Sequence, residues 1–234
     1  MFSHAFAAGA LLGTAISPLV CVSAAERSPV AAAEDVVARV TPSAKGAVLF
    51  HLNPDQGNKI TISGIAGGIR VEASDVRRLV AGYGWYLKNI AKVHFSWNGN
   101  RITLPSPLPV PASPVTVESP WNIVFAYNYC TLSYTAAFWD WNRWQREIDF
   151  LALNGFTHAL VTAGLEKTWE DFLTGLGYPR EKALRFIPNP AFAAWWNMGN
   201  LEGHGGPLSQ QQINKMAQMG RRIVSRMEQL GMTP

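Results

Sequence analysis

Short apolar runs separated by polar turns mark the first half of the chain. Three of these runs have the length of strands and are rich in Val, Ile and Leu: residues 47–52, 59–63 and 68–72. Apolar and polar positions alternate in the second and third runs, which is typical of strands with one buried face. The pattern therefore predicts three β-strands.

Residues 74–90 change to helical periodicity, with apolar side chains three or four positions apart behind a Ser and an Asp that can cap a helix. Two further strands, at residues 93–97 and 101–104, are expected to flank a turn at residues 98–100. A helix combined with these short strands predicts a compact α+β domain over residues 43–104.

After residue 120 the pattern becomes strand followed by helix. Strands are expected at residues 122–126 and 156–163, and a helix at residues 136–153 ends between them at an Asn-Gly pair. Further helices are predicted at residues 167–176, 180–187 and 209–230, and residues 232–234 lead toward a third strand. This alternation is typical of the start of a (β/α)8 barrel.

The predicted fold class is α/β, with a small α+β N-terminal domain followed by an incomplete (β/α)8 TIM barrel. Residues 105–120 hold six prolines and are interpreted as an extended interdomain linker, and the Ala- and Val-rich residues 26–42 as a second linker. A closed barrel needs roughly 200 residues or more, so residues 121–234 supply only its first part. We therefore expect an N-terminal fragment of a longer protein.

The N-terminus has the composition of an export signal. Residues 5–22 are apolar and rich in small residues, and small-x-small cleavage sites follow directly. Residues 1–25 are interpreted as a secretory signal peptide, which predicts a periplasmic or extracellular protein whose mature form has no membrane span. A disordered or membrane-anchored start is an alternative, because Lys and Arg are missing before the apolar run. Lipidation at Cys21 is a further alternative, although Val20 precedes this cysteine.

Composition and charge narrow the class of function. With 48% hydrophobic and 15% charged residues, the chain has the makeup of a folded protein. The net charge of +4 comes without a block of Lys or Arg, so no nucleic-acid partner is expected. His158 and His204 have no partner at metal-ligand spacing, and no phosphate loop or dinucleotide motif is found. Neither a metal nor a cofactor is therefore expected.

Barrel strands present ligand-binding residues at their C-terminal ends and in the loops that follow. In this chain those positions are residues 127–134 and 163–166. Asn128 can donate and accept hydrogen bonds to sugar hydroxyls, and an ionised Glu166 can accept two. Each has a structural alternative, since Asn128 could cap the next helix and Glu166 could be an exposed residue in a first helical turn.

Several aromatic-rich motifs, taken in order, resemble the α-N-acetylglucosaminidases of glycoside hydrolase family 89. They are Asn128-x-Cys-Thr-x-Ser-Tyr134, Trp139-Asp-Trp141 and Ala191-Phe-Ala-Ala-Trp-Trp-Asn-Met-Gly-Asn-Leu201. The resemblance extends from about residue 46 to residue 234. It implies an enzyme that acts on glycans ending in α-linked N-acetylglucosamine and releases this sugar by retaining hydrolysis.

The resemblance also implies which residues line the subsite for the terminal sugar. They are Asn128, Cys130 and Tyr134 in the first motif, and Trp195 and Met198 in the last. An indole face or a thioether can pack on the apolar face of a sugar or on its acetamido methyl group. Core packing is the alternative for Cys130, Trp195 and Met198, and the Trp residues at positions 139–144 are expected in the core.

In the family both catalytic glutamates come from later strands, so both are expected beyond Pro234 and this chain alone is expected to be inactive. Leu165 stands where the family has Gln, and residues 202–205 replace an aromatic-bearing stretch. These departures leave the leaving-group side of the substrate open. A glycan-binding or structural remnant without turnover, and a nonfunctional frameshift product, are the alternatives to the enzyme.

Overall fold

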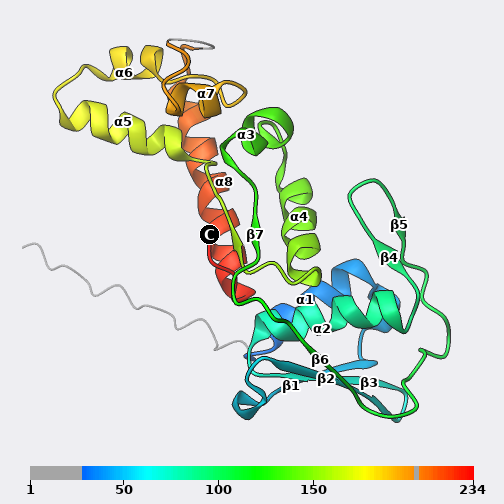
Figure 1. The fold of residues 1–234 in the computed structure, drawn as a ribbon. Coiled ribbons are helices and arrows are strands. Elements are labelled where there is room, and N and C mark those ends of the chain that lie inside the picture. Colours follow the sequence, from blue (N-terminus) through cyan, green and yellow to red (C-terminus); the bar gives the residue numbers. More distant parts are fainter. Residues whose placement is uncertain (1–27, 203–205) are drawn as a thin grey trace, which may run out of the picture.

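The computed structural model describes residues 28–202 and 206–234 (Figure 1). The expected signal peptide and Cys21 lie outside the described residues. Figure 1 shows a body built on a β-sheet and an elongated helical part, with the long helix α8 (Gln210–Gln229) running between them. The mixed architecture confirms the predicted fold class.

A four-stranded sheet forms the base of the N-terminal domain. Its strands are β1 (Val48–Leu52), β2 (Lys59–Ile65), β3 (Gly68–Ala73) and β6 (Val115–Glu118), in the spatial order β1-β3-β2-β6. β1 pairs with β3 in parallel, and the other pairs are antiparallel. Ile62 and Val71 lie opposite each other and are fully buried, so the alternating pattern places its apolar positions on the core face.

Helices α1 (Ala31–Val40) and α2 (Val76–Asn89) cover one face of this sheet (Figure 1). Asp75 caps α2, as the sequence predicts, by accepting a hydrogen bond of 2.8 Å from the backbone N–H of Arg78. Tyr83 of α2 is fully buried and its hydroxyl group is hydrogen-bonded to that of Thr41 at 2.5 Å. The two helices and the sheet thus share one core.

The linker expected at residues 26–42 is largely a helix instead. The buried side chains of α1 recur at helical spacing: Ala33, Val36, Val37 and Val40. The side chains of this Ala and Val stripe are small, but together they bury enough apolar surface to fix α1 against its neighbours. The Pro-rich linker also differs, because residues 115–118 form strand β6 at the edge of the sheet.

The expected strand pair after α2 is reduced to a short hairpin, β4 (His94–Phe95) and β5 (Asn100–Arg101). The hairpin packs against helix α4 (Trp141–Leu153) of the barrel part. The ring of Trp97 lies 5.0 Å from that of Phe150, and the guanidinium of Arg146 lies 4.6 Å from the ring of Phe95. The hairpin therefore connects the two halves of the chain.

The barrel part begins with two short parallel strands, β7 (Phe125–Ala126) and β8 (His158–Ala159). Thr233 forms a parallel bridge to His158, so the start of the expected third strand is confirmed. The helices are α3 (Tyr129–Thr131), α4 (Trp141–Leu153), α5 (Leu165–Gly175), α6 (Arg180–Phe186), α7 (Ala193–Asn197) and α8.

The first long barrel helix begins later than predicted. Residues 129–136 form α3 and a π-helical turn (Leu132–Ala136), and α4 starts only after Asp140. Asp140 caps α4 by accepting a hydrogen bond of 2.8 Å from the N–H of Arg143. Helix α7 is an additional element that the periodicity does not predict, because five residues are too short to show it.

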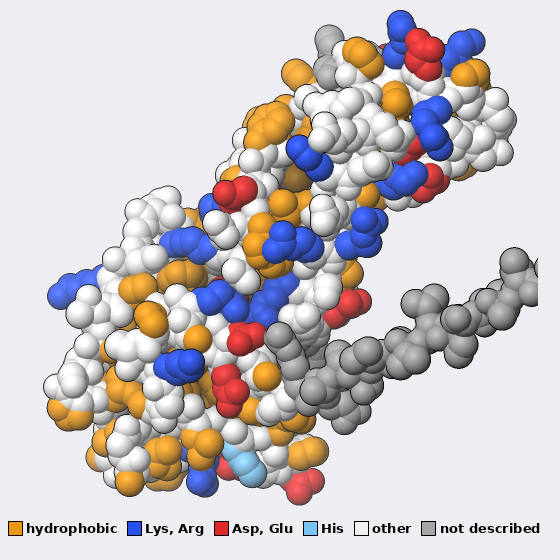
Figure 2. Space-filling view, turned by 180° about the vertical axis from the view of Figure 1, so that it is seen from behind, with side chains coloured by type: hydrophobic (Ala, Val, Ile, Leu, Met, Phe, Trp, Pro, Cys, Tyr) orange, Lys and Arg blue, Asp and Glu red, His pale blue; other side chains and the backbone are white. Residues whose placement is uncertain are grey.

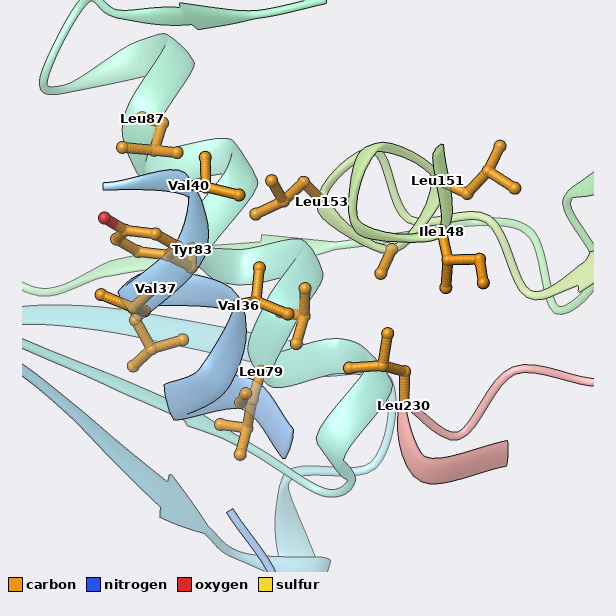
Figure 3. Packing of buried hydrophobic residues seen from close by; sticks show 14 of the residues in the cluster. Val36, Val37, Val40, Leu79, Tyr83, Leu87, Ile148, Leu151, Leu153 and Leu230 are labelled. Atoms are coloured by element: carbon orange, nitrogen blue, oxygen red, sulfur yellow. The ribbon is translucent and has the colours of Figure 1, made fainter. Parts of the chain in front are cut away.

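The two halves of the chain pack directly against each other where α2 meets α4. Figure 3 shows Leu79 and Tyr83 of α2, Ile148 of α4, and Leu230 near the C-terminus in one buried cluster. At Gly84 of α2, an added Cβ would lie 1.8 Å from the carbonyl oxygen of Leu153. Only glycine allows the helices to approach this closely.

Replacing Gly84 by Ala is expected to lower the free energy of unfolding by about 1–3 kcal/mol, because α2 and α4 must separate to admit a methyl group. Denaturant unfolding measures this change. Gly175→Ala is the matched control, since Gly175 is also helical and has nothing within 4 Å of an added Cβ. The control is expected to be neutral or stabilising by ~0.5–1 kcal/mol. Equal effects of the two substitutions would contradict the close contact.

Candidate functional site

The turn that follows β7 is held by its own hydrogen bonds. Asn128 Oδ1 accepts from the backbone N–H groups of Cys130 at 3.0 Å and Thr131 at 3.2 Å. Thr131 Oγ1 accepts in return from the N–H of Asn128 at 3.3 Å, which completes a capping box. The alternative role of Asn128 as a helix cap is therefore real. Because the cap engages the amide oxygen, the amide nitrogen Nδ2 is the atom that can serve a ligand.

The backbone just before this turn is strained. Tyr127 has a φ of 74°, a left-handed conformation that costs a non-glycine residue free energy. Its hydroxyl group donates a hydrogen bond of 2.6 Å to Glu147 Oε1. This bond and the Asn128 cap hold the chain on both sides of the strained peptide.

The turn is fastened to α7 through a buried hydroxyl group. Ser133 Oγ donates to the carbonyl oxygen of Pro190 at 2.9 Å and accepts from the N–H of Ala194 at 3.0 Å. Ser133 is 7% exposed, so both bonds are shielded from water and fix the segment before α7 to the turn.

The residues predicted to line the sugar subsite lie on these joined elements. The rings of Tyr134 and Trp195 meet edge to face with centroids 5.0 Å apart. Tyr134 is 74% exposed, and Met198, which ends α7, is 42% exposed. Asn128 is exposed and Cys130 is half-buried on α3, which contacts α7. Tyr134 and Trp195 are thus in direct contact, and the other three lie on α3, its cap and the end of α7, while their role in sugar binding stays a prediction.

Helix α7 is itself held by aromatic contacts on its other side. The ring of Trp196 lies 4.8 Å from that of Trp169 and 5.2 Å from that of Phe186. Trp169 Nε1 donates a hydrogen bond of 3.1 Å to Asn197 Oδ1. Since Trp196 is buried and Trp195 is not, these contacts fix the direction in which Trp195 projects.

Glu166 lies in a different environment from the other five residues. It is 4% exposed and lines a cavity of about 10 Å³, roughly the size of one water molecule, with Trp169 and Trp196. Burial raises the pKa of its carboxyl group to about 7, although hydrogen bonds from its own N–H and that of Gly164 act in the opposite direction. The alternative of an exposed helix residue is therefore wrong, and the sugar-binding role of Glu166 stays a prediction for a side chain that lines this small cavity together with residues of α7.

Glu147 is a buried carboxylate of α4 at the centre of a hydrogen-bond network. It is 1% exposed, and its Oε1 atom accepts from Tyr127 Oη and, at 3.1 Å, from Trp97 Nε1. Its Oε2 atom accepts from Arg143 at 2.8 Å. One carboxylate thereby joins the N-terminal hairpin, the strained peptide before Asn128 and helix α4.

Ser133, Tyr127 and Glu147 shape the site. Tyr127 and Ser133 lie within the segment expected to bind a ligand, but the sequence singles out none of the three as a site residue. Ser133 stands inside the Asn-x-Cys-Thr-x-Ser-Tyr motif, so the motif itself could have singled it out. Glu147 follows Arg143 by one helical turn, a spacing that normally indicates an exposed ion pair. Its partner Trp97 is 50 positions away, and no local pattern predicts such a contact.

The structure also bears on metals and membranes. Within residues 28–202 and 206–234, no group of three or more His, Cys, Asp or Glu side chains could hold a metal ion. None of the helices in this part of the chain is long and apolar enough to cross a membrane.

Two protein-family models match the chain in the order of its two halves. Residues 31–110 match the N-terminal domain of α-N-acetylglucosaminidase, and residues 124–234 match the TIM-barrel domain of the same family. The first match begins at α1, which agrees with the helix found in place of a linker.

Known proteins similar to this chain are much longer. The human α-N-acetylglucosaminidase is 37% identical over 171 residues, which cover 73% of this chain and 23% of the human protein. A family 89 glycoside hydrolase from Clostridium perfringens, solved in complex with 2-acetamido-1,2-dideoxynojirimycin, superposes with a TM-score of 0.84 at 29% identity. A variant of that enzyme in complex with its substrate GlcNAc-α-1,4-galactose gives the same TM-score at 28% identity, and each match covers 88% of this chain and 24% of the other. The chain therefore belongs to the α-N-acetylglucosaminidase family, glycoside hydrolase family 89.

Proposed function

We propose that the chain forms the N-terminal domain and the first part of the catalytic barrel of an exported enzyme. This enzyme removes terminal α-linked N-acetylglucosamine from glycans with retention of configuration. The Clostridium perfringens relative is described with a substrate that carries this sugar, which supports the substrate class. The observation that carries the proposal is the Asn128 turn fastened to α7 through Ser133, because it joins the two elements on which five candidate sugar-binding residues lie.

In this proposal each group has a task suited to its chemistry. Asn128 Nδ2 donates a hydrogen bond to a sugar hydroxyl while Oδ1 caps α3. The crossed rings of Tyr134 and Trp195 present apolar surface to the face of the sugar. Met198 and Cys130 add soft, polarisable contacts of the kind that suit an acetamido methyl group.

Bond cleavage is assigned to groups outside this chain. Retaining hydrolysis needs two carboxyl groups about 5–5.5 Å apart, one as nucleophile and one as acid and base. Of the buried carboxylates in the described residues, Glu147, Asp149 and Glu170 are each held in ion pairs with Arg or Lys, which gives them a structural role, and Glu166 is enclosed at 4% exposure. We therefore assign sugar binding to this part and expect the catalytic pair beyond Pro234.

Export is proposed on the composition of residues 1–25, which is that of a signal peptide. A second candidate function, glycan binding without turnover, is favoured by the same binding residues together with the ion-paired carboxylates. Hydrolysis assays on a longer native form and on the 234-residue chain distinguish the two, since only the proposed enzyme gains activity with added length.

Asn128→Asp is expected to separate the capping role from the binding role. Asp caps a helix about as well as Asn, so the free energy of unfolding should change by less than about 0.5 kcal/mol. The lost amide donor should weaken binding of N-acetylglucosamine about tenfold, the equivalent of ~1.4 kcal/mol. Titration of the 234-residue chain with N-acetylglucosamine, followed by NMR, measures the affinity, and denaturant unfolding measures the free energy of unfolding. Asn142→Asp, on the exposed surface of α4, is the control. Unchanged affinity, or no binding by the unmodified chain, would refute the sugar subsite.

Glu147→Gln is expected to destabilise the protein by about 1.5–3 kcal/mol. The –NH2 group of the glutamine would replace Oε2, so that two hydrogen-bond donors, this group and the Arg143 guanidinium, would face each other without an acceptor. Glu181→Gln is the matched control, since Glu181 also pairs with an arginine one helical turn away, Arg185 at 2.9 Å, but both side chains are exposed. Its cost should stay below about 0.5 kcal/mol. If thermal unfolding shows equal losses, Glu147 has no special place in the structure.

The stability of the protein is expected to fall as the pH rises through the titration of Glu166. The folded pKa of about 7 lies above the ordinary value of 4.5, so folding favours the neutral carboxyl group. This stabilisation is fully present below pH 4.5 and is lost through pH 7, which amounts to roughly 2 kcal/mol between about pH 5 and 7.5. Glu166→Gln should remove this part of the pH dependence in denaturant unfolding. An identical slope in both proteins would show that Glu166 titrates normally.

A further inference from the structure

A groove outside the sugar site lies where α1, α4 and α8 meet. It has a volume of about 430 Å³ and is lined by four arginines: Arg39, Arg221, Arg222 and Arg226. Seen from behind, the molecule gathers Lys and Arg side chains near its middle, interleaved with few acidic ones (Figure 2). The groove thus differs from the sugar site in both position and charge.

The arginines outnumber the carboxylates that could neutralise them. Asp149 is 2% exposed beneath the groove and accepts two hydrogen bonds from Arg39, at 2.7 and 2.8 Å. Its Oδ1 atom also lies 3.5 Å from Arg226. Asp35 is the other carboxylate of the groove, so four guanidinium groups meet two carboxylates and positive charge remains in excess.

Arg226 carries an N–H that the described residues do not satisfy. The side chain is 5% exposed, and its Nε atom is buried with no hydrogen-bond partner in this part of the chain. Its other contacts are long, with a hydrogen bond of 3.4 Å to the carbonyl oxygen of Ala32. A buried guanidinium with an unsatisfied N–H and long contacts is stabilised when an anion binds nearby.

The outer edge of the groove holds its arginines in a defined arrangement. Arg222 lies over the ring of Trp141, with Cζ 4.0 Å from the ring centroid, and this stacking limits the motion of the guanidinium. Arg221 and Ser225 lie on the same face of α8, one turn apart. The groove therefore presents planar donors that are partly fixed before any ligand arrives.

We propose that this groove binds a tetrahedral oxyanion, sulfate or phosphate, either as the free ion or as an ester. Guanidinium groups donate paired, parallel hydrogen bonds that match two oxygens of such a group. Because the groove is open to solvent, the affinity falls as the ionic strength rises. The proposal is independent of the sugar subsite and of the proposed enzymatic activity.

Isothermal titration of the 234-residue chain with inorganic sulfate and inorganic phosphate, at constant ionic strength, tests the proposal. Saturable binding is expected, and Arg221→Gln combined with Arg222→Gln should weaken it at least tenfold. Both side chains lie on the exposed side of α8, so circular dichroism should show an unchanged fold. Arg101→Gln combined with Arg185→Gln is the matched control, since it removes the same charge from exposed positions elsewhere. This control should bind within twofold of the unmodified chain.

Two further ligands, glucose 6-sulfate and glucose 6-phosphate, identify the source of the anion. Binding equal to that of the free ions means that the groove recognises the group alone, and tighter binding means that it recognises the group on a sugar. Heats no greater than those of chloride would overturn the proposal. Equal losses in the two double variants would also overturn it, because net charge alone would then explain the binding.

Discussion

Two carboxylates buried on helix α4 connect the separate parts of this molecule. Glu147 receives hydrogen bonds from Trp97 of the N-terminal hairpin and from Tyr127, which directly precedes the Asn128 turn. Asp149 is bound by Arg39 of α1 and approached by Arg226 of α8. A charge removed from water is tolerated only when it is paired, and loss of one partner typically costs about 3–5 kcal/mol. The orientation of α4 relative to the N-terminal domain is therefore constrained by charge as well as by packing.

The buried Glu147 is linked to the candidate sugar site through the strained backbone of Tyr127. Tyr127 adopts its left-handed conformation while its side chain is tied to Glu147 and the next residue caps α3. Burial and the bond to Glu147 raise the pKa of Tyr127, so its hydroxyl group stays a donor. A turn fixed from both sides presents Asn128 and Cys130 in one arrangement, which is the condition for a binding site that need not reorganise.

The sequence predicts the regular elements well because their signals are periodic. Strands β1, β2 and β3 and helices α2 and α8 follow alternating or helical patterns that local physics explains, whereas β6 lies in the segment expected to be a Pro-rich linker. The sequence does not predict helix α1, because Ala and Val also suit an extended linker, and it does not predict α7, because this helix spans barely more than one turn. The burial of Glu166 and Glu147 depends on residues brought together from distant positions, such as Trp196 and Trp97. A single sequence carries no signal for those contacts.

In a (β/α)8 barrel the strands normally position the site. In this chain they contribute little to the position of the candidate site. β7 and β8 each comprise two residues, so they orient the turn only weakly. Ser133 and the aromatic contacts of Trp196 instead join the turn, α7 and α5 into one unit. All of these contacts are made between residues 128 and 197. The arrangement of the candidate sugar-binding residues is thus built from local docking, whereas the proposed function leaves bond cleavage to carboxylates that the rest of a barrel would place opposite it.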